Sequence, residues 1–303
     1  MIKSIKPYTW HRNIIKSILS VIIIVNLSLA QEVIGFSMGY ESFPLTTLAD
    51  PVDPSDFKIG TNSFQFGAAF PMSFKSGKIL LMNNLNYKKV TFNTENEPPG
   101  GIDLKNAYSI EYSAFMIDSL SQKWSMILSI VPGLASDFEG DISSDDLTLQ
   151  VIFGYLRNYS EKLNIGYGLA YMRDFGSPMA FPFIYVDWMI NEKLKLSGII
   201  PTGLDLAYTY NDKIDMGLSF TITGNRYHGD PDIYLADNPQ MEYSEGTLSP
   251  RISYHIVPQW LHLNLEGGYA FYRNFEFMDG DQTVESYDLD PVAYFRMSLV
   301  LGM

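Results

Sequence analysis

Apolar and polar residues alternate with a period of two along most of the chain. In the segment "AYFRMSLVLGM" at 293–303, Phe295, Met297 and Leu299 are apolar, whereas Arg296 and Ser298 lie between them. Because successive side chains of a strand point to opposite faces, such a segment has one apolar face and one mixed face. The same alternation recurs at 34–40, 64–74, 108–116, 124–130, 147–155, 163–171 and 214–222. The pattern predicts β-strands whose second face carries small or polar residues.

Short and long connections alternate between these predicted strands. The short turns are "FKSGK", "DSLSQK", "NYSEK", "INEK", "NDK" and "VPQW", and the longer polar segments lie at about 43–57, 93–104, 135–145, 174–180, 228–246 and 276–286, with "PTG" at 201–203 as the exception. An up-and-down barrel gathers its short turns at one rim, which in outer-membrane barrels is the periplasmic one, whereas a soluble sandwich does not sort its loops. We therefore predict an all-β fold, a transmembrane up-and-down antiparallel β-barrel of about 14 strands, or about 12 if the short segments within 193–211 are not strands.

The tryptophans give an independent indication of membrane depth. Trp124, Trp188 and Trp260 are the tryptophans that follow residue 30, and each lies next to a short turn. Transmembrane barrels collect aromatic residues in girdles at the membrane surface. The alternative is coincidence, because tryptophan also occurs near strand ends in other folds. The girdle interpretation agrees with the sorting of the turns.

The N-terminal 30 residues have the three-part pattern of a secretory signal peptide. Basic residues, among them Lys3 and Lys16, precede an apolar stretch at 18–25, and the small residues Ser28 and Ala30 follow it. The apolar stretch is shorter than the roughly 20 residues that a spanning helix needs. The sequence therefore predicts a signal peptide at 1–30, cleaved after Ala30, and a single outer-membrane β-barrel domain at 31–303.

Composition narrows the set of partners and chemistries. Hydrophobic residues make up 46% of the chain and aromatic residues 14%, and there is no cysteine, which excludes disulfides and thiolate metal sites. Loss of residues 1–30 would remove four of the 21 Lys and Arg and none of the 34 Asp and Glu, leaving a net charge of −17. Such a charge argues against nucleic acid as a partner. The expected partners are outer-membrane lipids, lipopolysaccharide, and the barrel-assembly machinery during biogenesis.

One polar segment, "DFEGDISSDD", is rich in carboxylates. Asp137, Glu139, Asp141, Asp145 and Asp146 are candidate metal ligands. A Ca²⁺ loop of the EF-hand type needs a glycine at its sixth position, where Ile142 stands here. The segment is therefore either a solvated extracellular loop or a divalent-cation site that bridges lipopolysaccharide phosphates.

Three longer segments resemble a known family. The segments "VPGLASDFEGDISSDDLTLQ", "GLAYMRDFGSP" and "LNLEGGYAFYRNFEF", in this order, resemble a family of bacterial outer-membrane barrel proteins that is defined only as a domain of unknown function. The resemblance covers roughly residues 58 to 303. It implies a barrel, and it supplies no activity and no site residues.

Strand register predicts a charged patch on the inner wall. A turn centred on Pro258 and Gln259 places Arg251 opposite Glu266 and keeps the apolar residues of both strands on the other face. The predicted lumen-facing patch consists of Arg251, His255, His262, Glu266 and Arg296. It is either a constriction that selects solutes by charge or a set of ion pairs that neutralises buried charges.

Three functional classes remain open for such a barrel. A barrel of about 14 strands is wide enough to need a channel or a plug, so a porin-like channel or facilitator for small solutes is favoured over a structural or adhesive barrel with a filled lumen. A lipid-modifying enzyme is the remote alternative, because none of the three histidines after residue 30 lies in a nucleophile motif such as GxSxG. We therefore predict no enzymatic activity, no cofactor and a small-molecule cargo that the sequence does not identify.

Overall fold

The computed structural model describes residues 34–49, 57–96, 106–172, 178–229, 238–258 and 260–302. Residues Ile34–Met303 form one compact unit. The predicted signal peptide at 1–30 lies outside the described residues. Among the described residues, no helix is long and apolar enough to cross a bilayer.

Every regular element of the described residues is a β-strand. The strands are β1 (Gly35–Thr47), β2 (Lys58–Phe74), β3 (Ile79–Glu95), β4 (Asn106–Ser119), β5 (Trp124–Ser136), β6 (Leu147–Ser160), β7 (Leu163–Met172), β8 (Met179–Met189), β9 (Leu194–Ile200), β10 (Gly203–Asn211), β11 (Ile214–His228), β12 (Pro239–Val257), β13 (Leu261–Asp279), β14 (Gln282–Asp288) and β15 (Val292–Leu301).

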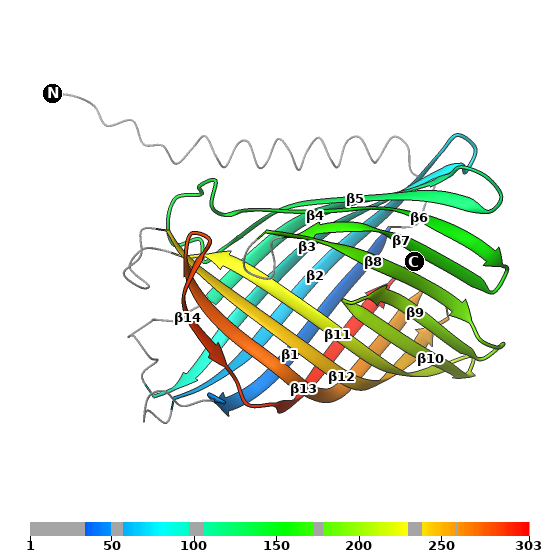
Figure 1. The fold of residues 1–303 in the computed structure, drawn as a ribbon. Helices are drawn as coiled ribbons and strands as arrows, with labels where there is room; N and C mark the ends of the chain where they lie inside the picture. Colours follow the sequence, from blue (N-terminus) through cyan, green and yellow to red (C-terminus); the bar gives the residue numbers. More distant parts are fainter. Residues whose placement is uncertain are drawn as a thin grey trace. The chain divides into compact units, whose positions relative to one another are not determined.

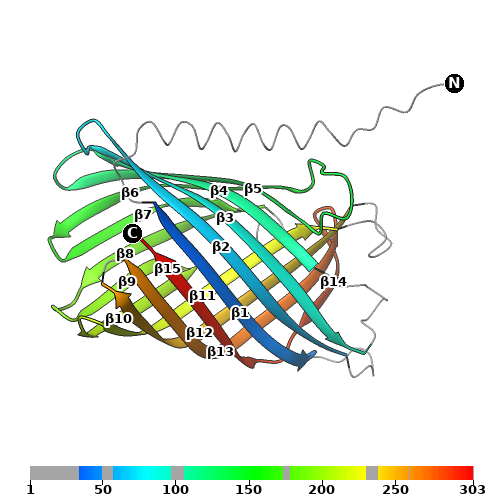
Figure 2. The same ribbon diagram turned by 180° about the vertical axis from the view of Figure 1, so that it is seen from behind.

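Fourteen of these strands close into an antiparallel barrel (Figures 1 and 2). From β1 to β13 each strand pairs with the next one along the chain, β13 also pairs with β15, and β15 pairs with β1. The remaining strand, β14, pairs with the outer part of β13. The predicted number of 14 is therefore confirmed. The short segments within 193–211 form β9 and β10, which excludes the alternative of 12 strands.

The alternation of the sequence corresponds to an outer apolar face and an inner mixed face. On β15, the outward-facing side chains of Phe295 and Met297 are 44% and 41% exposed. The side chain of Tyr294, on the opposite face of the same strand, is buried. Large apolar side chains are exposed in the same way on the other strands of the wall. A surface this apolar is stable in contact with lipid and not with water. The chain is therefore a transmembrane β-barrel.

The connections sort between the two rims as predicted, with two corrections. The connections β2–β3, β4–β5, β6–β7, β8–β9, β10–β11 and β12–β13 have two to four residues and share one rim, the short-turn rim, with the start of β1 and the end of β15. Trp124, Trp188 and Trp260 lie at this rim. The predicted loop at 228–246 is wrong beyond Pro239, where β12 begins, and that at 276–286 is a hairpin of β13 and β14 around Gly280 and Asp281.

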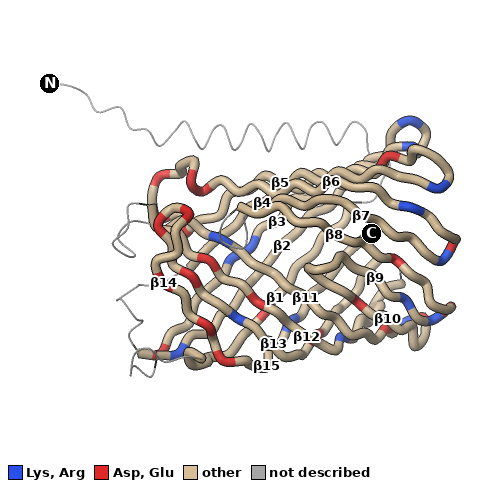
Figure 3. The backbone as a smooth tube through the Cα atoms, in the orientation of Figure 1, with Lys and Arg blue, Asp and Glu red and all other residues tan. Residues whose placement is uncertain are grey.

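The two corrected segments are polar because their strands extend past the apolar belt. β12 and β13 each have 19 residues, and their outer halves pair with each other over Pro239–Gly246 and Tyr272–Asp279. Figure 3 shows that acidic residues gather at this end, the long-loop rim, whereas basic residues gather at the short-turn rim. A strand outside the bilayer no longer needs an apolar outer face, so its sequence resembles that of a loop.

Near the long-loop rim an apolar cluster, the outer apolar plug, extends across the interior. Its buried members are Phe57, Ile59, Val90, Phe92, Ala107, Ala135, Tyr227, Tyr243, Phe275 and Leu289. Residues of β2–β5 pack here against residues of β11–β13, as in the edge-on contact of Phe92 and Phe275, whose ring centroids are 5.6 Å apart. The ends of β5 and β11 also meet, because Ser136 pairs with His228. The walls of the barrel therefore touch at this end.

Candidate functional site in the lumen

Arg296 is the centre of a charged cluster on the inner wall. It lies on β15 between β1 and β13, opposite Glu41 on one side and Glu266 on the other. Its Nε donates to Oε2 of Glu41 at 2.6 Å, and its Nη1 donates to Oε2 of Glu266 at 3.1 Å. Both contacts are within a wall where side chains are only partly exposed, so each carboxylate depends on this guanidinium for its neutralisation.

A third carboxylate approaches the same guanidinium from β12. Oε1 of Glu245 lies 3.9 Å from Nη2 of Arg296, and Glu245 is buried. The Tyr243 hydroxyl donates to its Oε2 at 2.7 Å, and the Thr223 hydroxyl donates to its Oε1 at 3.3 Å. Three carboxylates thus share one arginine.

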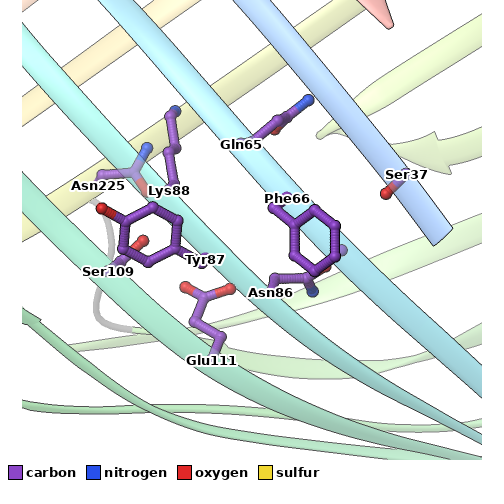
Figure 4. Close-up of a pocket in the computed structure, with 10 residues that line it drawn as sticks. Ser37, Gln65, Phe66, Asn86, Tyr87, Lys88, Ser109, Glu111 and Asn225 are labelled. Atoms are coloured by element: carbon purple, nitrogen blue, oxygen red, sulfur yellow. The ribbon is translucent and has the colours of Figure 1, made fainter. Parts of the chain in front are cut away.

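A cavity of about 380 Å³ lies beside this cluster. It is lined from several walls at once, by Glu41 and Arg296 on one side and by Lys88 and Glu111 on β3 and β4. A second cavity of about 370 Å³ shares Lys88, Glu111 and Asn225 with the first, and Figure 4 shows how these side chains are grouped. We call the two together the polar cavity.

A second polar cluster lies closer to the short-turn rim. Arg251 on β12 donates from Nε and Nη2 to the two carboxylate oxygens of Asp205 on β10, each at 2.6 Å. Its side chain reaches β10 by crossing β11 at Gly217, where an added Cβ would lie 2.8 Å from Nε of Arg251. His255 contacts His262, and its Nε2 lies 2.8 Å from Oδ2 of Asp215.

The structure places the five residues of the predicted patch on the inner wall but pairs them differently. Arg251 lies opposite Glu266, and His255 lies opposite His262, in the predicted register. The carboxylate that binds Arg251 is nevertheless Asp205, and Glu266 binds Arg296 instead. Near the turn the register shifts, because Val257 lies opposite Leu261, where a turn centred on Pro258 and Gln259 would place Ile256. Gln259 lies outside the described residues.

Sequence reasoning missed several charged residues of the lumen. They are Glu41, Lys88, Glu111, Asp205, Asp215 and Glu245. Each occupies a position of its strand that points inward. The alternation of the strand could therefore have shown that these residues face the lumen. Their partners could not be read from it, since Glu41 and Arg296 meet only through closure of the first strand against the last.

The inner face of β4–β9 is apolar, which the sequence analysis did not predict. This inner apolar wall consists of Phe115, Ile117, Ile127, Ile152, Leu156, Ala170, Met172, Phe181, Phe183, Tyr185 and Ile199. The ring of Phe183 lies against two glycines, because an added Cβ would lie 2.9 Å from it at Gly154 and 2.7 Å from it at Gly168. The lumen thus carries an apolar stretch on β4–β9, next to polar positions of the same strands such as Glu111 and the ion pair of Asp187 with Lys195. The clusters around Arg296 and Arg251 lie on the other strands.

The five candidate metal ligands are not brought together. Asp146 is buried, and its carboxylate lies 2.8 Å from Nδ1 of His228 and accepts from the Ser143 amide at 2.6 Å. Asp137 accepts from the Glu139 amide at 3.1 Å. Over the described part of the chain, no group of three or more Asp, Glu, His or Cys side chains has the arrangement of a metal site. The segment is held by bonds within itself and to β11.

A search of solved structures finds outer-membrane channels and porins that share little sequence with this chain. An outer membrane channel from Pseudomonas putida F1 is 10% identical with a TM-score of 0.48, covering 90% of this chain and 96% of that one. The Pseudomonas putida toluene transporter TodX is 8% identical with a TM-score of 0.40, covering 91% of each chain. The NanC porin is 10% identical with a TM-score of 0.38, covering 89% of this chain and all of the other. At these values the likeness carries no argument about this chain.

Sequence comparison identifies the family. No curated protein matches the chain. The profile of the family described as Domain of unknown function (DUF6268) matches residues 40–303, which includes the segments on which the resemblance was based. The chain belongs to this family.

Proposed function

We propose that this protein is an outer-membrane channel for small solutes, exported by a cleavable signal peptide at residues 1–30. The observation that carries the proposal is the polar cavity, about 380 Å³ in its larger part, inside a closed transmembrane barrel. A channel needs polar groups in its lumen to replace the hydration of a passing solute. The short-turn rim faces the periplasm in this proposal, as is usual for outer-membrane barrels.

The lining of the cavity favours cations over anions. Glu41, Glu111 and Glu245 line it together with Lys88 and Arg296, so acidic groups outnumber basic ones. Glu266, which binds Arg296, adds a further negative charge beside it. Charged side chains around a constriction set the sign of the ions that pass.

The outer apolar plug favours a second candidate, a structural barrel with a filled lumen. Phe92, Tyr243 and Phe275 fill the interior where the walls touch near the long-loop rim. In that case the charged cluster only satisfies buried charges, and no solute passes. The two candidates differ in permeability, which can be measured directly.

Liposome swelling tests the proposal. Vesicles that contain the purified barrel should swell in isotonic solutions of small polar solutes, at rates that fall as the solute grows. Thr223→Trp should slow the swelling severalfold, because Thr223 lines the cavity and a large ring would occupy it. Thr283→Trp on the β13–β14 hairpin is the matched control and should leave the rate unchanged. Absence of swelling with the unmodified barrel would favour the filled lumen and refute the channel.

A further inference from the structure

The wall of the barrel is interrupted between β8 and β11. The β9–β10 hairpin is short, so β8 pairs with β9 only from Ile184 onward and β11 pairs with β10 only up to Thr221. Among the described residues, Met179–Phe183 of β8 and Thr223–Asn225 of β11 have no strand partner on the sides that face each other. The Ile222 amide, next to this edge, donates to the Thr202 carbonyl of the hairpin turn at 2.8 Å. Figure 1 shows the hairpin ending below the outer parts of both strands.

The composition of β8 agrees with an unpaired edge. Pro182 lies within the stretch that has only β7 as a neighbour. Proline lacks the amide hydrogen of a sheet ladder, so inside a strand it is confined to edges and bulges. At the level of the hairpin turn, β8 and β11 are separated by two strands, which corresponds to about 14 Å at the usual strand spacing.

The polar cavity reaches this interruption from inside. Thr221, Thr223, Gly224 and Asn225 of β11 all line the cavity, and the last three belong to the unpaired edge. Unpaired backbone groups cost several kcal/mol each in hydrocarbon and are tolerated at membrane depth only where they border protein or water. The cavity supplies that polar border along the inner side of the β11 edge.

The inner apolar wall reaches the same interruption from the other side. Phe181 and Phe183 of β8 belong to this wall, and it continues across β7, β6 and β5 to Ile127, three residues from the short-turn rim. A path along it stays apolar on one side and faces the charged cluster on the other. Such a path matches a molecule that has both an apolar body and a polar head.

Apolar side chains narrow the straight route through the long-loop rim. The outer apolar plug lies there, and the Asp137 amide donates to the His228 carbonyl at 3.1 Å where β5 meets β11. Along β11, the interruption lies between the contact of β5 with β11 and the short-turn rim. A molecule that enters from the membrane can therefore reach the lumen without passing the plug.

We propose that the interruption between β8 (Met179–Phe183) and β11 (Thr223–Asn225) is a lateral gate for amphipathic molecules. The molecule enters from the leaflet next to the long-loop rim, its apolar body slides along the inner apolar wall, and its polar head occupies the polar cavity. Only the exit toward the short-turn rim rests on the proposed channel function; access from lipid to the inner wall does not.

Single cysteines in this cysteine-free chain test the gate. Phe181→Cys lies on the inner wall beside the interruption, and Phe115→Cys lies on the same wall in β4, whose two neighbours are paired around it. Both side chains are half-buried. Pyrene maleimide dissolved in the lipid should label Phe181→Cys at least about tenfold faster than Phe115→Cys, because a closed wall excludes reagents in the bilayer.

The labelled protein then gives a functional readout that is separate from the channel. Transfer of a fluorescent dodecanoate from the lipid into the aqueous interior of the vesicle should proceed with unlabelled Phe181→Cys and stop after labelling, while swelling by small polar solutes continues. Equal labelling at both positions, or transfer that is absent or insensitive to the label, would overturn the gate. Loss of swelling in the unmodified protein would instead refute the channel, so the two failures are distinguishable.

Discussion

Replacement of Arg296 by Met should lower the free energy of unfolding of the barrel by about 3–5 kcal/mol. Glu41 and Glu266 would then lie in the wall without the guanidinium that both bind. Urea titration of the barrel in lipid vesicles, followed by tryptophan fluorescence, measures the change.

An exposed ion pair provides the control for this prediction. Lys58 lies 2.9 Å from Glu95, and both side chains are more than a third exposed. Lys58→Met should therefore change stability by about 0–1 kcal/mol. A double variant that also carries Glu41→Gln should recover part of the loss, because one uncompensated charge is removed. Equal small effects of the two single variants would show that Arg296 does not neutralise the wall.

Replacement of Gly168 by Val should prevent the barrel from assembling. An added Cβ at Gly168 would lie 2.1 Å from the carbonyl oxygen of Phe153 and 2.7 Å from Cα of Gly154, both of which are backbone atoms of β6. Backbone cannot move aside without breaking the strand pairing, so the cost should be about 3 kcal/mol or more. The readout is the fraction of protein that resists unfolding by detergent until it is boiled, as seen by its shifted migration on a gel.

Gly267 is the matched control, because a Cβ there would have no atom within 4 Å. Gly267→Ala should assemble normally. Normal assembly of Gly168→Val would mean that β6 and β7 do not approach as closely as described.

The sequence predicted the wall of the barrel well because its signal is local. The alternation of apolar and polar residues has the period of a strand, and a transmembrane barrel requires it on every strand. The same alternation predicted the pairing of Arg251 with Glu266, because only that register keeps the apolar residues of both strands on one face. Where strands extend beyond the lipid, as in the outer half of β12, the apolar face is no longer required and the signal disappears.

The partners within the lumen could not be predicted, because they depend on side-chain reach across several strands. Arg251 binds Asp205 two strands away, and it does so because Gly217 leaves space on the strand between them. The inner apolar wall escaped notice for a different reason. Segments such as "MAFPFIYVDWM" in β8 are apolar on both faces. A rule that assigns apolar residues to the lipid-facing side therefore misplaces those that point into the lumen.

Single-channel recording in a planar bilayer tests the central claim most directly, namely that the lumen conducts solutes through a charged constriction. The purified barrel should give steady ohmic current steps, and in a salt gradient the reversal potential should show a preference for cations, as the excess of Glu41, Glu111 and Glu245 over Lys88 and Arg296 requires. A silent bilayer, at protein amounts that give a fully folded band on the gel, would contradict the channel, and a preference for anions would contradict the assignment of the charged cluster as its constriction.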